Sequence, residues 1–90
     1  MSDQRFIYGA LEQLVDGHNR WNPQLRQMYD SGVLRGVPIT RSPNGKLFLI
    51  KCPDKARSCV DDMCARLHLD VQCTDAQGAR ALMQSSEWGV

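Results

Sequence analysis

Residues 37–52 read VPITRSPNGKLFLIKC, and this stretch decides the fold class. Val37, Ile39 and Arg41 alternate with other residues before the turn sequence SPNG at 42–45. Proline presets the first dihedral of such a turn, and Asn-Gly tolerates positive φ. The returning segment 46–52 carries apolar residues on both faces, which is typical of a strand covered on both sides. We therefore predict a β-hairpin whose second strand is central in a sheet.

Beyond the hairpin, the pattern alternates between helix and strand. Pro53-Asp54 opens a predicted helix with an apolar stripe, a short strand follows over 70–73, and Thr74 with Gln77 matches a capping box for a last helix. The second hairpin strand, the helix and the strand over 70–73 form a β-α-β unit. If its two strands run parallel in one sheet, its crossover is right-handed.

Before the hairpin, we predict two helices. Ser2 is a plausible N-cap for the first, which is expected to end near residues 17–19. Its apolar face is made by residues at helical spacing, namely Ile7, Leu11, Leu14, Val15 and His18. Asn22-Pro23 begins the second helix, and Ser31-Gly32 ends it.

These elements predict an α+β fold in the order α-α-β-β-α-β-α, in which a three-stranded mixed sheet with a β-hairpin packs against the helices. A chain of 90 residues fits one domain, so we assign 1–90 to a single globular unit with 85–90 as a loose C-terminal tail.

Composition is typical of a globular protein, with 42% hydrophobic and 23% charged residues. The longest apolar run covers only residues 47–50, so no segment is expected to cross a membrane. The N-terminus shows no basic stretch followed by an apolar one, so we expect no secretory signal and a cytoplasmic location. Reduced cysteines are expected in that compartment.

Charge is unevenly distributed although the formal net charge is only +1. The balance is −2 over residues 1–19, +6 over 20–57 and −3 over 58–90. A basic hairpin after two helices resembles the outline of a winged-helix domain, in which a hairpin touches phosphate. A near-neutral chain is unusual for a dedicated nucleic-acid binder, so nucleic-acid binding through 35–57 is the alternative function. The candidate residues for an anionic partner are Arg35, Arg41, Lys46, Lys51, Lys55 and Arg57.

A second candidate surface consists of aromatic residues and arginines, which are enriched at interface hot spots. Its members are Arg20, Trp21, Arg26 and Trp88. In so small a domain the aromatic residues are equally suited to the core.

The cysteines Cys52, Cys59, Cys64 and Cys73 lack the C-x2-C spacing of a zinc site, so we predict no metal and no cofactor. Cys52 stands before a predicted helix N-terminus and between Lys51 and Lys55, a setting that would lower a thiol pKa. A nucleophile also needs a positioned base, and nothing places either histidine beside it. A thiol enzyme or redox switch at Cys52 is therefore only the third hypothesis.

The leading hypothesis is a small non-catalytic binding protein: a protein–protein adaptor, regulator or inhibitor that can self-associate. It rests on the absence of any catalytic motif in a small domain that carries aromatic residues. A phage or mobile-element origin is a guess from size alone.

Overall fold

The computed structural model describes residues 5–34 and 36–89, and it confirms the α+β class. Two single-turn 3-10 helices, Leu11–Gln13 and Asp54–Ala56, follow the first strand and precede the second helix. The strands are β1 (Arg5–Ala10), β2 (Ile39–Arg41), β3 (Leu47–Cys52) and β4 (Val71–Thr74), and the helices are α1 (Pro23–Asp30), α2 (Arg57–Arg66) and α3 (Ala76–Met83).

The predicted hairpin is confirmed. β2 pairs antiparallel with β3, and Ile39 lies opposite Ile50. The turn closes through a hydrogen bond of 3.0 Å that the Gly45 amide donates to the Ser42 carbonyl. Gly45 has a φ of 73°, which explains why glycine stands at this position. The local turn chemistry was therefore sufficient to place this element.

The predicted first helix is wrong. Its described residues form strand β1 and the following 3-10 turn, and β1 pairs with β3 on one side and β4 on the other. Ile7, Leu11 and Leu14 are all buried, so the apolar spacing did mark the core. A strand followed by a tight turn buries the same three residues as a helix would. The strand forms because the backbone groups of β1 find hydrogen-bond partners in β3 on one side and in β4 on the other.

The sheet also differs from the prediction, because it has four antiparallel strands in the order β2-β3-β1-β4 rather than three mixed strands. The observed element order is β1-α1-β2-β3-α2-β4-α3. β1 occupies the position between β3 and β4, which run parallel to each other without being neighbours. The three pairs of neighbouring strands among the described residues are all antiparallel.

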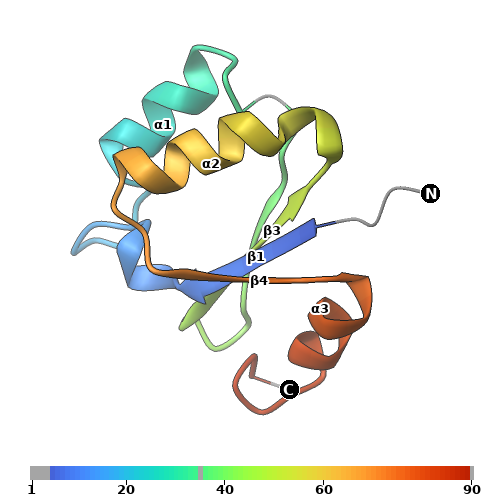
Figure 1. Ribbon diagram of the computed structural model, residues 1–90. Coiled ribbons are helices and arrows are strands. Elements are labelled where there is room, and N and C mark those ends of the chain that lie inside the picture. Colours follow the sequence, from blue (N-terminus) through green and yellow to red (C-terminus); the bar gives the residue numbers. More distant parts are fainter. Residues whose placement is uncertain (1–4, 35, 90) are drawn as a thin grey trace.

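Helices cover both faces of the sheet: α1 and α2 lie on one face and α3 on the other (Figure 1). Strands β1 and β3 run in opposite directions, and the crossovers that follow them, β1-α1-β2 and β3-α2-β4, step across the sheet in opposite directions. Two crossovers of the same handedness therefore place α1 and α2 on the same face. This split β-α-β arrangement is that of ferredoxin-like domains, with α3 added. Because such folds host many activities, it does not indicate a function.

Two clusters of buried side chains hold the layers together. The larger cluster, between the sheet and α1 and α2, includes Ile7, Phe48 and Val60. The smaller cluster, between the sheet and α3, is formed by Leu49, Ala79 and Trp88. Trp88 is only 5% exposed, so it lies inside the folded chain.

The last helix begins one residue later than predicted. The carboxylate of Asp75 accepts a hydrogen bond of 2.8 Å from the Gly78 amide and caps α3, whereas Thr74 ends β4. Aspartate is the stronger N-cap of the two residue types, which accounts for the shift. None of the helices in the described part of the chain is long and apolar enough to cross a membrane.

Candidate functional site

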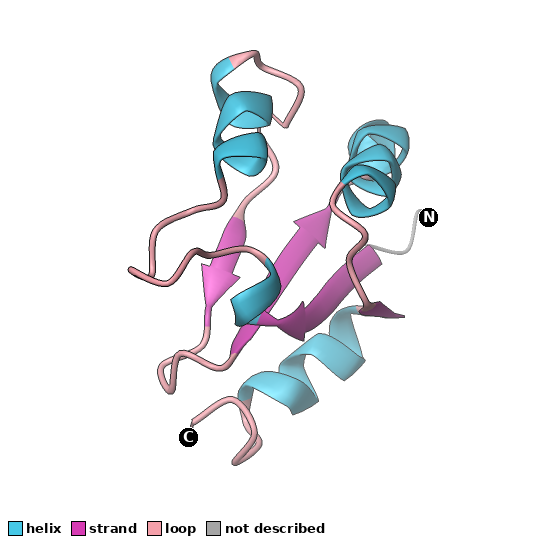
Figure 2. Cartoon of the chain, turned by 90° about the vertical axis from the view of Figure 1, so that its left-hand side faces the viewer, coloured by secondary structure: helices cyan, strands magenta, loops and turns pink. Residues whose placement is uncertain are grey.

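A hollow of about 320 Å³ lies beside the edge strand β2, beneath α1. Two of the predicted interface residues, Trp21 and Arg26, line it together. We call it the β2 hollow and define it by Trp21, Arg26, Tyr29, Val37, Pro38 and Ile39. Figure 2 shows β2 as the short strand at one edge of the sheet, with α1 above it.

Trp21 is positioned by a closed loop over residues 14–22. The Asn22 amide donates to the Leu14 carbonyl at 2.8 Å, and Val15 forms an isolated bridge with Trp21. The carboxylate of Asp16 accepts hydrogen bonds from the Arg20 and His18 amides, which lower the pKa of Asp16. Because the pKa of Asp16 is lower in the folded chain, its ionised carboxylate stabilises the loop at pH values above the pKa of the unfolded chain. This stabilisation is lost as the pH falls through the folded pKa.

Arg41 packs against Trp21 rather than facing solvent freely. Its guanidinium carbon lies 4.2 Å from the centre of a Trp21 ring, and Nη1 donates to the Asn19 carbonyl and side-chain oxygens at 3.3 Å each. This cation–π contact joins β2 to the 14–22 loop. Arg41, which was predicted to bind an anionic partner, thus supports Trp21, which was predicted for the surface of aromatic residues and arginines.

Helix α1 supplies the remaining wall. The side chain of Asn22 caps it by accepting from the Gln24 amide at 2.8 Å, with Pro23 at the first helical position, as predicted. Tyr29 donates its hydroxyl proton to the Val37 carbonyl at 2.7 Å, and burial raises the pKa of Tyr29. Arg26 lies one turn earlier on the same side, is exposed, and forms no ion pair with any described residue.

The outer edge of β2 carries free backbone groups. The Ser42 amide donates to the Leu47 carbonyl, and the Lys51 amide donates to the Pro38 carbonyl. In an antiparallel pair, every second residue points its backbone groups at the partner strand. Pro38, Thr40 and Ser42 therefore face β3, and the backbone N–H and C=O of Ile39 and Arg41 face outward.

The other predicted basic residues are not gathered at one place. Lys46 follows the hairpin turn, whereas Lys51 lies five residues along β3, about 17 Å away at ~3.3 Å per residue. Lys55 and Arg57 continue beyond the end of β3 in the 3-10 turn and the start of α2. Arg35 lies outside the described residues.

Two of the predicted interface residues do not line the β2 hollow. Arg20 sits in the 14–22 loop, 73% exposed, with its Nε 3.4 Å from an Asp16 oxygen. Trp88 belongs to the cluster under α3 on the opposite face of the sheet. The sequence reasoning missed Tyr29, Val37, Pro38 and Ile39 as parts of one site, and the only signal was the spacing of Arg26 and Tyr29 on one helical side.

A larger hollow, of about 420 Å³, lies between α1 and α2. Its lining is mostly amide and aliphatic, and its one cation, Arg66, already pairs with Asp62 at 3.0 Å. It borders no strand edge. Aromatic groups, an unpaired guanidinium and free backbone groups meet only at the β2 hollow among the hollows described, and we take it as the candidate site.

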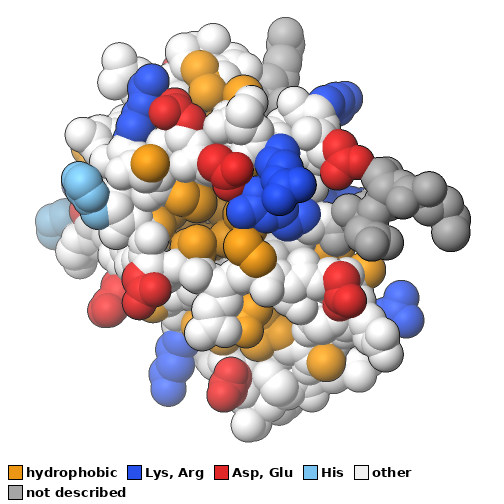
Figure 3. All heavy atoms as spheres, in the orientation of Figure 1, with side chains coloured by type: hydrophobic (Ala, Val, Ile, Leu, Met, Phe, Trp, Pro, Cys, Tyr) orange, Lys and Arg blue, Asp and Glu red, His pale blue; other side chains and the backbone are white. Residues whose placement is uncertain are grey.

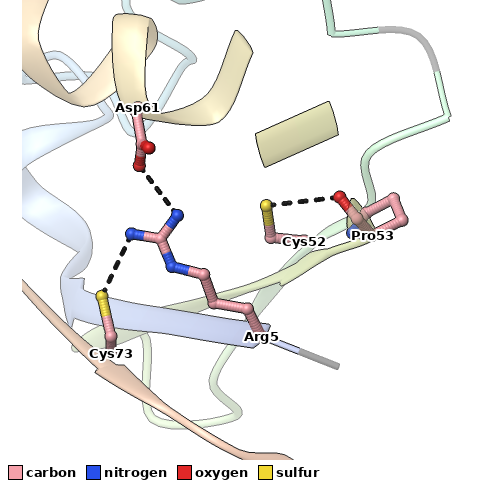
Figure 4. A network of polar contacts seen from close by, with 5 residues as sticks. All are labelled: Arg5, Cys52, Pro53, Asp61 and Cys73. Atoms are coloured by element: carbon pink, nitrogen blue, oxygen red, sulfur yellow. Dashed lines mark hydrogen bonds and ion pairs between the residues drawn. The ribbon is translucent and has the colours of Figure 1, made fainter. Parts of the chain in front are cut away.

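The thiols show a different pattern from the one predicted. Cys52 is 1% exposed, and burial raises its pKa, so the expectation that its neighbours lower it is wrong. Burial also raises the pKa of Cys64. Cys73, which is exposed on β4, accepts a hydrogen bond of 3.4 Å from Arg5, whose other nitrogen lies 2.8 Å from Asp61 (Figure 4). The bond to Cys73 is the main cause of a raised Arg5 pKa.

These settings predict the order of thiol reactivity. With iodoacetamide at pH 7.5, Cys73 is expected to be alkylated at least about tenfold faster than Cys52 and Cys64, because the thiolate is the nucleophile and burial disfavours it. Raising the pH should narrow this gap. Site-resolved mass spectrometry over time measures all four rates, with half-buried Cys59 as the internal control. Fast labelling of Cys52 in the native chain would restore the hypothesis of a thiol site there.

No known family model, curated protein or solved structure matches this chain. Its function is therefore argued from the geometry of the β2 hollow.

Proposed function

We propose that this chain is a non-catalytic binding module whose partner is another protein, held at the β2 hollow. The observation that carries the proposal is the meeting of Trp21, Tyr29 and Arg26 around one hollow of about 320 Å³. Tryptophan, tyrosine and arginine are the residue types that dominate binding energy at protein interfaces. An adaptor, regulator or inhibitor would each use such a site.

The aromatic side chains of the hollow are held in place by contacts with neighbouring residues, which favours binding. Trp21 is stacked on Arg41, and the Tyr29 hydroxyl is bonded to the Val37 carbonyl. Side chains that are already ordered lose little conformational freedom when a partner arrives. The walls come from three separate segments, so the folded chain holds a shape that none of them has alone.

Nucleic-acid binding through 35–57 has weaker support. Arg41 is engaged by Trp21 and Asn19, and Lys46 and Lys51 lie at opposite ends of β3. A phosphate-binding surface needs several cations that follow one backbone. This alternative is tested by the same experiment as the proposal.

Arg26→Ala is expected to weaken capture of a protein partner at least about tenfold, because it removes a hot-spot side chain from the hollow. Arg26 is exposed and unpaired among the described residues, so the fold should be unaffected. The measurement is a tagged pull-down from lysate of the natural host, treated with nuclease, followed by titration of the stoichiometric protein.

The matched control is Arg80→Ala, which removes an exposed arginine from α3, across the sheet from the hollow. It should bind like the wild type. Equal weakening by both variants would point to a general charge effect. A partner that disappears with nuclease would argue for the basic residues instead.

A further inference from the structure

The outer edge of β2 is short, and all of its outward backbone groups are free of hydrogen bonds to described residues. Ile39 and Arg41 each direct one N–H and one C=O away from β3, and no described residue bonds to these four groups. Pro38 lacks an N–H, but its backbone belongs to the row that faces β3, so it removes no outward donor. Such a row of unpaired groups is a template for an added strand.

The β2 hollow lies on the side of this edge that alternate side chains of an added strand would reach. Ile39 lies opposite Ile50, a core residue of the face covered by α1 and α2, and Ile39 also lines the hollow. In a strand, every second side chain points to the same face. A segment paired with β2 therefore directs alternate side chains beneath α1, toward Trp21 and Tyr29.

The charges around the hollow favour an acidic segment. Arg26 lines it and Arg41 stacks on Trp21 in its wall, and neither forms an ion pair with a described residue. Asp30 lies on α1 one turn beyond Arg26 but does not line the hollow. The site thus keeps two guanidinium groups without a carboxylate, and an acidic segment supplies what they lack.

We propose that the partner presents an extended acidic segment that adds as a strand to the outer edge of β2, with alternate apolar side chains in the β2 hollow and a carboxylate at Arg26. This inference rests on the proposed function and names its binding mode. Main-chain hydrogen bonds to Ile39 and Arg41 supply affinity, and the hollow supplies specificity. The three-residue length of β2 limits unselective pairing, because a short edge flanked by charge is a poor template alone.

The test uses the full chain and a displayed library of random twelve-residue peptides. Selection is expected to enrich acidic sequences with apolar residues at every second position. The best peptide, titrated by fluorescence anisotropy, should bind Arg26→Ala at least about tenfold more weakly and Arg80→Ala equally well. The peptide should also slow amide hydrogen exchange of Ile39 and Arg41 about tenfold or more.

N-methylation of the peptide tests strand addition directly. Methyl groups on the amides facing β2 should abolish binding, whereas methyl groups on the intervening amides should leave it unchanged. Tolerance at every position, or protection at the Val71–Thr74 edge instead, overturns the inference. Failure to enrich acidic peptides also overturns it. If the lysate partner is still lost with Arg26→Ala, the proposed function survives that failure; if Arg26→Ala changes nothing in either experiment, both fail.

Discussion

Trp88→Ala is expected to lower the free energy of unfolding by about 3–5 kcal/mol, the usual cost of truncating a buried tryptophan. Trp88 is 5% exposed and packs with Leu49 and Ala79, and Tyr8 lies partly buried against the same cluster. Removing the indole takes the largest of the three buried side chains out of the cluster between α3 and the sheet. Urea denaturation followed by circular dichroism gives the change.

Trp21→Ala is the matched control for this prediction. Trp21 is half-buried, so we expect a smaller loss of about 1–2 kcal/mol from the same chemical change. If residues 85–89 formed a loose tail, Trp88→Ala would alter stability by less than about 0.5 kcal/mol. That outcome would contradict the packing of Trp88 under α3.

Gly9→Ala is expected to destabilise the protein by about 1–3 kcal/mol, because there is no space for a methyl group. A Cβ at this position would lie 2.9 Å from the Asp70 carbonyl oxygen and 3.2 Å from the Phe48 ring. The contact is tight because Gln13 reaches across to Asp70, donating to its carbonyl at 3.0 Å and accepting from its amide at 2.6 Å. Urea denaturation measures the loss.

The sign of this change also separates a strand from a helix. In a helix over residues 2–17, alanine would stabilise the chain relative to glycine by about 1 kcal/mol. Gly17→Ala is the control, because a Cβ there meets nothing within 4 Å, and it should be neutral or slightly stabilising. A more stable Gly9→Ala variant would contradict the observed β1.

Fold prediction succeeded where local chemistry is decisive. The hairpin at 37–52, the start of α1 at Asn22-Pro23 and the helix after Pro53 were all predicted, because turns and caps depend on neighbouring residues. Strand β1 was missed because Ile7, Leu11 and Leu14 fit a helical stripe equally well. Its pairing partners stand more than 35 residues away in the sequence, beyond the reach of any local signal.

Site prediction succeeded in part for the same reason. Residue type alone singled out Trp21 and Arg26, and the structure places both at one hollow. It also singled out Trp88, which the fold buries. Sequence neighbours suggested a low pKa for Cys52, but its burial at the end of β3 raises it, since desolvation outweighs the nearby cations.

A further apolar patch lies away from the β2 hollow. Hydrophobic side chains gather in the middle of the surface formed around α2 and β4 (Figure 3). Partly buried residues of this region include Cys64, Leu69 and Val71. Exposed apolar patches mark interaction surfaces, and β4 is the other edge strand of the sheet, but no charge pattern among the described residues here selects an occupant. The test peptides are therefore compared at both edges of the sheet.

By itself, the sequence determined the α+β class, the hairpin, the start of α1, the helical segment after Pro53 and most of the buried positions, because these follow from turn chemistry and from the spacing of apolar residues. Only the tertiary structure decided that β1 fills the centre of a four-stranded sheet, that the cations separate along β3, and that Trp21, Arg26 and Tyr29 meet beside a free edge. The reason is that these features depend on contacts between distant segments, whose relative placement is set by the packing of the whole core.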